Sequence, residues 1–323
     1  MKKYNIAIIG LGYWGTIVTN TIISMNLFDK IYIYDTDISK IKILKKKFGK
    51  KVIKIDFDKI LHNNEIKHIF LATPPKINFN ILRLLIRSKK NVLIEKPGMV
   101  NLKFFNKIAK ELKRNKTKLT FGYIYIYNIY IRYLKKIIQS KKLGKIKYIN
   151  FQRQNFGPIR NNVSASYDLA THDISILSYL FNKKIKLKKL IKHDILGKKN
   201  YDISFLNLET NNVKIDINVS WLNPEKIRKI IIIGSKKMLL FDEMNMNEPI
   251  KIYNNYVNFP KIDKFSKLYF NQSKYIFKGK STSIKLKSNK PLNNEIEEFI
   301  KSKKNLTDID FAKNIIKTLN DVN

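Results

Sequence analysis

The chain has 323 residues, of which 44% are hydrophobic, so it has enough apolar material for two domains, the expected number at this length. Cysteine is absent, which excludes disulfides, thiolate zinc sites and cysteine nucleophiles and favours a reducing compartment, here the cytoplasm. The 64 lysine and arginine residues outnumber the 25 aspartate and glutamate residues and give a net charge of +39.

This positive charge has two interpretations. It attracts polyanions, which favours a nucleic-acid or anionic-membrane partner. However, only seven basic residues are arginine, and the lysines run along the whole chain, as in KKIKLKKLIKHD (Lys183–Asp194), rather than gathering in one segment. Lys, Ile, Asn and Tyr are all abundant and have A/T-rich codons, so compositional drift explains the excess. We therefore expect solvated lysines, no specific nucleic-acid partner and no membrane partner.

The segment NIAIIGLGYWGTIV (Asn5–Val18) follows two lysines and fits either a signal peptide or a nucleotide site. Three glycines interrupt the run, no small-residue cleavage site follows, and the run is far shorter than the ~20 residues of a membrane span. In a nucleotide site each glycine has a role. Gly10 makes a tight turn after a buried strand, Gly12 lets the backbone approach a pyrophosphate, and Gly15 lets the next helix pack closely. We therefore favour a dinucleotide site.

The next expected strand, KIYIYD, ends at Asp35, 20 residues after Gly15. A carboxylate at this place accepts hydrogen bonds from the adenosine ribose hydroxyls. Its charge repels the 2′-phosphate of NADP, and no arginine follows it. We therefore expect NAD as the cofactor and NADP as the less favoured one.

Strand and helix patterns alternate through the first 120 residues, which predicts a parallel sheet with helices on both faces. The further strands expected here are KVIKI, HIFLAT, NVLIEK and KLTFGY. Six strands in this order predict a doubly wound, Rossmann-type domain over residues 1–121.

Residues 122–323 are expected to form a second, α+β domain. Helices are predicted in residues 127–145 and 168–181 and twice near the C-terminus, and a strand in IKYINFQRQ. Alternating segments predict a large, open, mostly antiparallel sheet, namely YDISFLNLET, VKIDINVSWL, RKIIIIGSK, KMLLFDE and IKIYNN. The expected mobile loop is residues 271–283.

The pair Glu95 and Lys96 ends the apolar strand of NVLIEKPGMV, before Pro97. Ligands of open parallel sheets bind outside the carboxyl ends of the strands. A lysine there can hydrogen-bond a substrate oxygen and favour its deprotonation. The alternative is an ordinary exposed Glu-Lys pair at a strand end.

In YDLATHDISIL, Asp168 and His172 are four residues apart at the start of a helix and share a face. Histidine suits proton transfer near neutral pH, and a carboxylate beside it can orient the ring. Asp173 points elsewhere and is expected to serve structure. The alternatives are a partly buried structural histidine and, with less support, a metal site formed by these three residues.

The segment RQNFGPIRNN places Arg153 and Arg160 on either side of Asn155 in an expected loop. The planar guanidinium group suits two-pronged contact with phosphate or carboxylate, so the loop could bind a phosphorylated substrate. Equally, both arginines could pair with acidic neighbours.

Together, GLGYWG, ATPP, EKP and the spacing of Asp168 and His172 resemble the glucose-fructose oxidoreductase, inositol dehydrogenase and MocA (Gfo/Idh/MocA) family over nearly the whole chain. The resemblance implies reversible hydride transfer between a nicotinamide ring and a secondary alcohol of a sugar or cyclitol. It implies that Lys96 contacts substrate and positions nicotinamide, and that His172, with Asp168 as its partner, acts as general base in oxidation and general acid in reduction. It further implies a homodimer or homotetramer joined through the open sheet.

The remaining site residues follow from the resemblance by motif. The expected cofactor-binding residues are Gly10, Gly12, Tyr13, Trp14, Gly15, Asp35, Thr73, Pro74, Glu95 and Lys96. The expected substrate-binding residues are Lys96, Tyr123, Arg153, Asn155, Arg160 and His172. No metal is expected. The chain departs from the family at Asn78, where histidine is common, and at Tyr123 and Ile126, where histidine and arginine are common.

Narrower segments, GLGYWG, NFGPIR, DLATHDI and WLNPEKIRKI, resemble the nucleotide-sugar branch and its UDP-N-acetylglucosamine 3-dehydrogenases. This implies oxidation of UDP-N-acetylglucosamine at C3 in cell-surface glycan or lipid A-type biosynthesis. The alternatives are a 3-ketosugar reductase, a cyclitol or free-sugar dehydrogenase and, more remotely, an NAD-sensing nucleic-acid-binding regulator.

Overall fold

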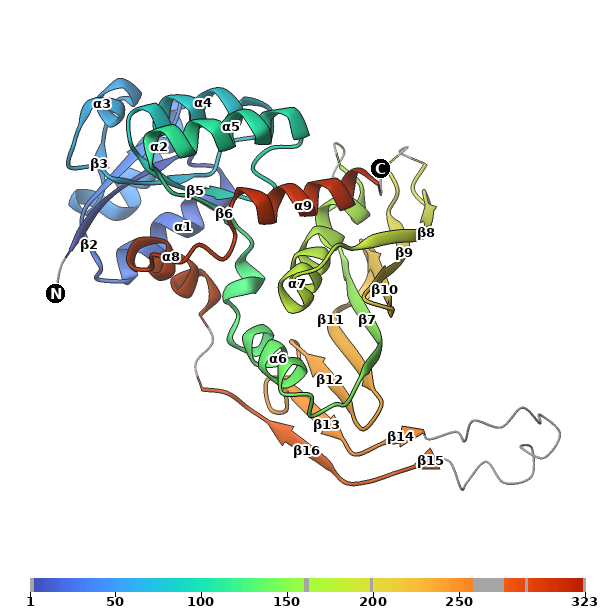
Figure 1. The fold of residues 1–323 in the computed structure, drawn as a ribbon. Coiled ribbons are helices and arrows are strands. Elements are labelled where there is room, and N and C mark those ends of the chain that lie inside the picture. Colours follow the sequence, from blue (N-terminus) through green and yellow to red (C-terminus); the bar gives the residue numbers. More distant parts are fainter. Residues whose placement is uncertain (1–2, 160–162, 198–199, 258–275, 288–289, 322–323) are drawn as a thin grey trace. The chain divides into compact units, whose positions relative to one another are not determined.

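The computed structural model describes residues 3–159, 163–197, 200–257, 276–287 and 290–321. The chain forms two compact units: unit 1 is Met1–Asn128 with Lys290–Lys317, and unit 2 is Ile129–Asn289 with Thr318–Asn323. A single division after residue 121 therefore needs correction, because a C-terminal segment returns to the first unit. Figure 1 shows this return as the red α8 beside the blue α1.

Unit 1 is built on a parallel sheet of six strands in the order β3-β2-β1-β4-β5-β6. The strands are β1 (Tyr4–Ile9), β2 (Phe28–Tyr34), β3 (Ile53–Lys54), β4 (His68–Leu71), β5 (Asn91–Glu95) and β6 (Leu119–Gly122). Except in the exposed edge strand β3, their short apolar runs are buried because helices cover both faces. The order is that of a doubly wound dinucleotide fold, as the sequence predicts.

Five helices of unit 1 alternate with its strands, and two more come from the C-terminal segment. They are α1 (Tyr13–Ser24), α2 (Ile38–Phe48), α3 (Phe57–His62), α4 (Pro75–Arg87), α5 (Leu102–Asn115), α8 (Pro291–Lys301) and α9 (Ile309–Asn320), the last ending beyond the unit boundary, with short turns η1 (Gly49–Lys51) and η2 (Ile124–Tyr127). One face of α8 buries Ile296 and Phe299 in the same core as Ile6 and Val18. This burial explains why α8 belongs to unit 1.

Unit 2 contains a mixed sheet whose eight strands, in the described part of the chain, lie in the order β16-β13-β12-β11-β7-β10-β9-β8. The strands are β7 (Ile146–Phe156), β8 (Lys186–His193), β9 (Ile203–Thr210), β10 (Val213–Ser220), β11 (Leu222–Gly234), β12 (Met238–Asp242), β13 (Ile250–Tyr253) and β16 (Ser281–Ile284). Only the β7 and β10 pair is parallel among these strands. A mostly antiparallel sheet is therefore confirmed.

One face of this sheet is buried and the other is not. Along β10, Val213, Ile215 and Ile217 are buried, whereas the alternate residues Lys214 and Asp216 are more exposed. The helical segments of the unit are α6 (Ile129–Gln139), the π-helical turn η3 (Ser166–Ala170) and α7 (Thr171–Phe181), and η3 packs against β10. The turn that precedes α7 is therefore held against the middle of the sheet.

Several strands of unit 2 lie where the sequence predicts none. The lysine-rich segment expected as solvated surface forms the edge strand β8, in which lysine protects an otherwise open edge from pairing with another chain. Part of the expected mobile loop forms β16 and the short β15 (Ile276–Phe277), which pairs with β14 (Tyr256–Val257). Residues 271–275 of that loop lie outside the described residues.

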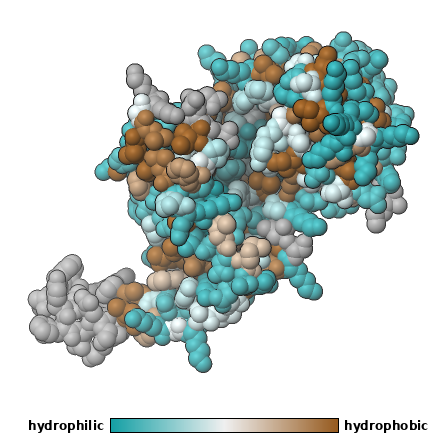
Figure 2. Space-filling view, turned by 180° about the vertical axis from the view of Figure 1, so that it is seen from behind, coloured by the Kyte–Doolittle hydropathy of each residue, from teal (hydrophilic) through white to brown (hydrophobic). Residues whose placement is uncertain are grey.

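Hydrophilic residues cover most of the face shown in Figure 2, and hydrophobic residues interrupt them in small patches. Within the described ranges, no helix is long and apolar enough to cross a membrane.

Candidate active site

The three glycines where β1 passes into α1 have different roles. Gly10 has φ +92°, and a Cβ there would lie 2.7 Å from the Ala72 carbonyl oxygen, so only glycine fits. A Cβ at Gly15 would clash with the Gly10 carbonyl oxygen. At Gly12, by contrast, an added Cβ would meet no atom of the described chain within 4 Å, and this residue lines an open pocket. The fold requires Gly10 and Gly15, while Gly12 leaves room for a ligand.

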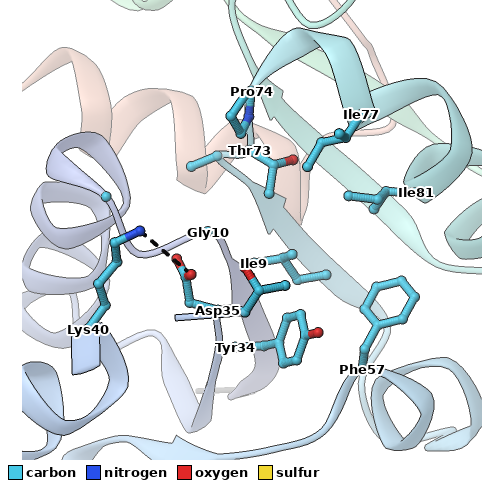
Figure 3. A pocket seen from close by; sticks show the side chains of 13 residues that line it. Ile9, Gly10, Tyr34, Asp35, Lys40, Phe57, Thr73, Pro74, Ile77 and Ile81 are labelled. Atoms are coloured by element: carbon cyan, nitrogen blue, oxygen red, sulfur yellow. Dashed lines mark ion pairs between the residues drawn. The ribbon is translucent and has the colours of Figure 1, made fainter. Parts of the chain in front are cut away.

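This pocket has a volume of about 680 Å³ and opens beside the carboxyl ends of β1, β2 and β4 (Figure 3). Tyr34 and Phe57 form part of its wall with ring centroids 5.7 Å apart, and Ile77 and Ile81 of α4 line another part. Thr73 and Pro74 also line it. Apolar and aromatic walls with few polar groups suit a flat base such as adenine. The residues present therefore fit a dinucleotide.

Asp35 is fixed at the edge of the pocket by backbone donors. Its Oδ2 accepts a hydrogen bond from the Leu11 N–H at 2.7 Å, and its Oδ1 accepts one from the Asp37 N–H at 2.8 Å. Lys40 Nζ lies 3.7 Å from Asp35 Oδ1, as the dashed line in Figure 3 shows. The sequence interpretation missed Lys40. Asp37 caps α2 by accepting a hydrogen bond from the Ser39 N–H, and this cap places Lys40 in the first turn of the helix, near Asp35.

The two loops that carry Thr73 and Lys96 are joined by Asn78. Thr73 Oγ1 donates to Asn78 Oδ1 at 2.5 Å, and Asn78 Nδ2 donates to the Gly98 carbonyl oxygen at 2.7 Å. Asn78 is 1% exposed, so neither bond competes with water. Asn78, the residue that departs from the family, thus connects the two loops.

A pair of acids lies where β5 ends. Protein surrounds the carboxyl group of Glu95, and this desolvation raises its pKa to about 7, against the opposing effects of the Lys96 charge and the Trp14 indole N–H. Glu295 of α8 is 1% exposed, and burial, followed by the charge of Glu95, raises its pKa well above the usual value. Its Oε1 has no hydrogen-bond partner among the described residues. Sequence reasoning missed Glu295, because an amphipathic pattern does not show which core a helix joins.

The other expected residues of unit 1 differ in exposure. Tyr13 is 85% exposed at the start of α1, and Trp14 packs against the core of unit 1. Tyr123 is fully buried, with its ring 5.7 Å from that of Phe311 in an edge-to-face arrangement. This burial favours a packing role for Tyr123 over the predicted contact with substrate.

In unit 2, the expected helix start is a π-helical turn. Asp168 lies in η3 and His172 in the first turn of α7, and both are half-buried. Because a π turn holds more than 3.6 residues, two residues four apart across it are not stacked as in an α-helix. Tyr167, next to Asp168, has a buried hydroxyl whose pKa burial raises to about 12. The pairing of Asp168 with His172 stays a prediction.

The segment around Arg153 forms a strand, whereas the sequence predicts a loop there. This residue lies inside β7, is 4% exposed, and donates to Asp173 from both Nε and Nη2. Asp173 therefore serves structure, as expected, and the acidic-partner alternative describes Arg153. Asn155 Nδ2 donates to the Gly157 carbonyl oxygen, and its Oδ1 accepts from Arg228 Nη2. Arg160 lies outside the described residues.

No three histidine, aspartate or glutamate side chains gather as metal ligands among the residues that the structure describes. The donors of the pocket are instead backbone N–H groups, hydroxyls and one lysine. This set suits a ligand rich in oxygen atoms.

Two family models match the chain. A model of an oxidoreductase family with an NAD-binding Rossmann fold matches residues 4–123, and a model of the Gfo/Idh/MocA C-terminal domain matches residues 131–240. The matched ranges include the glycine turn, Asp35 and Lys96 in the first model and His172 in the second.

Curated relatives match this chain at low sequence identity. The chain is 20% identical over 189 residues to a myo-inositol 2-dehydrogenase of Thermotoga maritima, covering 56% of each chain. It spans about half the length of the curated relatives it matches.

Solved structures match over almost the full length. A UDP-N-acetylglucosamine 3-dehydrogenase from Acidithiobacillus ferrooxidans has a TM-score of 0.81 at 15% identity, covering 100% of this chain and 97% of that one. A 3-ketoreductase from Actinomadura kijaniata has a TM-score of 0.78 at 10% identity, covering 99% and 97%. At these identities the likeness establishes the fold alone.

Proposed function

Because the chain belongs to the Gfo/Idh/MocA oxidoreductase family, we propose that it transfers a hydride between NAD and a secondary ring carbon of a nucleotide sugar. The family is shown by models that cover both parts of the chain, and its members oxidise CH–OH groups or reduce the corresponding ketones. Beyond family membership, we propose that the substrate is a nucleotide sugar and that the cofactor is NAD.

The observation that carries the proposal is the pocket beside the glycine turn. Gly12 leaves open space where a diphosphate would meet the first N–H groups of α1, and Asp35 holds a carboxylate at the end of the next strand. The positive end of a helix favours an anion, and a fixed carboxylate accepts hydrogen bonds from ribose hydroxyls. Together these features support a dinucleotide bound along the carboxyl ends of β1, β2 and β4.

The bound cofactor supplies the hydride acceptor, and residues of the chain supply proton transfer and charge. In the proposal His172 removes the proton from the reacting hydroxyl, and Asp168 orients the ring. The ammonium group of Lys96 donates a hydrogen bond to the same oxygen and stabilises the negative charge that develops there. In the reverse direction His172 returns the proton.

Fewer observations support a nucleotide sugar as the substrate than support a dinucleotide as the cofactor. It is supported by the resemblance of NFGPIR and WLNPEKIRKI to the nucleotide-sugar branch and by the likeness to a structure named as a UDP-N-acetylglucosamine 3-dehydrogenase. Arg153, committed to Asp173, does not support it. Arg160 remains the residue proposed to contact the substrate diphosphate, and Asn155 is also proposed to bind the substrate.

A panel of substrates tests the proposal. NADH absorbance is followed after NAD is mixed with UDP-N-acetylglucosamine, UDP-glucose, a dTDP-sugar or myo-inositol, with a carbonyl trap to pull the equilibrium. NADH formed only with the UDP-amino sugar is the expected result. NADH formed only with myo-inositol would replace the substrate class with cyclitols. Consumption of NADH by a 3-keto sugar, without the forward reaction, would assign a ketosugar reductase.

A further inference from the structure

A lysine-rich surface covers α2, η1 and β3 of unit 1. Between Asp37 and Asp56 the chain has eight lysines and no acidic residue. Two of the eight have partners, since Lys40 lies beside Asp35 and Lys45 donates to backbone carbonyl oxygens. The other six are exposed and form no ion pair in the described part of the chain; they are Lys42, Lys46, Lys47, Lys50, Lys51 and Lys54.

Two isoleucines are exposed among these lysines. Ile43 is 64% exposed on α2, where Lys46 and Lys47 follow it by three and four residues and therefore share its face. Ile53 is 39% exposed on the edge strand β3, directly before Lys54. Because α2 packs against both η1 and β3, these residues lie on neighbouring parts of the surface. We call the six lysines and the two isoleucines the basic patch.

The lysine-rich strand β8 differs from the basic patch, because acidic residues face it. Lys188 Nζ lies 3.4 Å from a carboxylate oxygen of Glu209 on the neighbouring strand β9, and Lys214 of β10 pairs with the same carboxylate. Acidic residues thus offset part of the positive charge in that region. The charge of the basic patch is therefore available to an anionic partner, whereas part of the charge around β8 is not.

The side chains of the basic patch fit an anionic lipid surface better than a nucleic acid. Clusters of about four to eight lysines are attracted to anionic headgroups, and apolar side chains among them can enter the boundary between headgroups and acyl chains. Nucleic-acid sites typically use arginine and stacking aromatic rings. The patch contains no arginine, and Phe48, the aromatic residue beside it, packs against the core of unit 1.

We propose that the basic patch docks the chain on anionic lipid bilayers, with its lysines beside the headgroups and Ile43 and Ile53 at the boundary with the acyl chains. This docking is peripheral and needs no helix that spans the bilayer. It goes beyond the proposed hydride transfer and does not depend on it. It differs from the sequence-based expectation of no membrane partner, which treated the lysines as one evenly spread charge.

Co-sedimentation with vesicles tests the proposal. The vesicles contain phosphatidylcholine with about 30% phosphatidylserine, or phosphatidylcholine alone. The salt concentration is about 150 mM, where charges more than ~8 Å apart are largely screened, so that the general positive charge of the chain contributes little. The first variant combines Lys42→Gln, Lys46→Gln and Lys50→Gln.

Each variant has a matched control. The control for the lysines removes three charges from exposed positions of unit 2 by combining Lys183→Gln, Lys186→Gln and Lys189→Gln. The variant Ile43→Ser tests the apolar contact, and its control is Ile195→Ser, because both isoleucines are 64% exposed. Circular dichroism verifies that all variants are folded.

The wild type should bind the vesicles that contain phosphatidylserine and not those of phosphatidylcholine alone. A lysine beside an anionic bilayer strengthens binding by about fivefold, so the triple variant of the patch should bind roughly a hundredfold more weakly. Its control should stay within about threefold of the wild type. Ile43→Ser should weaken binding by about tenfold, and Ile195→Ser by less than about twofold.

Three results would overturn the inference. The first is no binding of the wild type to phosphatidylserine vesicles. The second is an equal loss in the two triple variants, which would assign the effect to general charge. The third is binding to a single-stranded RNA that is lost in the patch variant, while vesicle binding does not change, which would assign the patch to nucleic acid. None of these results bears on hydride transfer, which the substrate panel tests separately.

Discussion

The guanidinium of Arg153 donates two hydrogen bonds to Oδ1 of Asp173, from Nε at 2.9 Å and from Nη2 at 2.7 Å. Their side chains are 5% and 2% exposed. Burial raises the pKa of Asp173, and the charge of Arg153 opposes that effect. The pair fastens α7, which carries His172, to β7 at the middle of the sheet.

Removing one partner of this pair should destabilise unit 2. Arg153→Met leaves a buried carboxylate without its cation, and we expect the free energy of unfolding to fall by about 3–5 kcal/mol. Urea unfolding measures the loss. Lys214→Met is the control, because its partner Glu209 lies at the surface and the exposed pair contributes less than about 1 kcal/mol. A loss from Arg153→Met no larger than that of the control would contradict the role assigned to the pair.

Asn78 should be needed to hold the loop of Lys96. Asn78→Leu keeps the volume but leaves the Thr73 hydroxyl and the Gly98 carbonyl without their buried partner, which should cost about 1–3 kcal/mol. We also expect a lower kcat, because Gly98 lies two residues after Lys96. The control Asn80→Leu changes an exposed residue of the same helix and should alter stability by less than about 0.5 kcal/mol. Equal effects of the two variants would disprove this connection.

The acid pair Glu95 and Glu295 should make unit 1 less stable as the pH rises. Both pKa values are raised in the folded chain, Glu95 to about 7 and Glu295 well above its usual value. A group with a raised folded pKa contributes stability that is complete below its unfolded value, near 4.5, and is lost as the pH rises through the folded value. The unfolding free energy should therefore decrease between about pH 4.5 and 8.

Glu295→Gln isolates this effect, because the amide is neutral at every pH. The variant should be more stable than the wild type at pH 8 and should show a smaller decrease between pH 5 and pH 8. Glu297→Gln is the control on the same helix, since 49% of the Glu297 side chain is exposed. Thermal unfolding across this pH range measures both. If stability falls with pH as steeply in Glu295→Gln as in the wild type, Glu295 does not titrate as described.

His172 and Asp168 should affect turnover without affecting NAD affinity. His172→Ala removes the proposed base and should lower kcat by about 10²–10⁴. Asp168→Asn should lower it less, because it removes only the orienting carboxylate. His193→Ala, which changes an exposed histidine of the same unit, should retain full activity. Steady-state kinetics with NAD and UDP-N-acetylglucosamine provide the measurement, and a fully active His172→Ala would exclude this residue as the base.

Local features of the molecule were predictable from the sequence. Gly10 and Asp35 directly follow short apolar strands, and Gly15 lies in the first turn of the helix after the glycine turn; such positions depend on a few neighbouring residues. The parallel sheet followed from alternating strand and helix patterns, and its strand order is the one expected for that class.

Features that depend on distant partners were not predictable. The sequence left Arg153 open between binding an anion and pairing with an acidic residue, because its partner Asp173 lies 20 positions away on another element. The pattern of α8 shows an apolar face but not the core it enters, so the return to unit 1 and the burial of Glu295 were missed. Lys40 was missed because its place near Asp35 depends on how Asp37 caps α2.

The central claim is hydride transfer from a ring carbon of a UDP-amino sugar to the nicotinamide. The most direct measurement uses UDP-N-acetylglucosamine deuterated at C3, with NAD and a carbonyl trap, and determines by mass spectrometry whether deuterium enters the reduced cofactor. We expect one deuterium per NADH in the wild type and none with Lys96→Met or His172→Ala. No transfer of deuterium from this substrate, in a sample where NAD is bound, would contradict the claim.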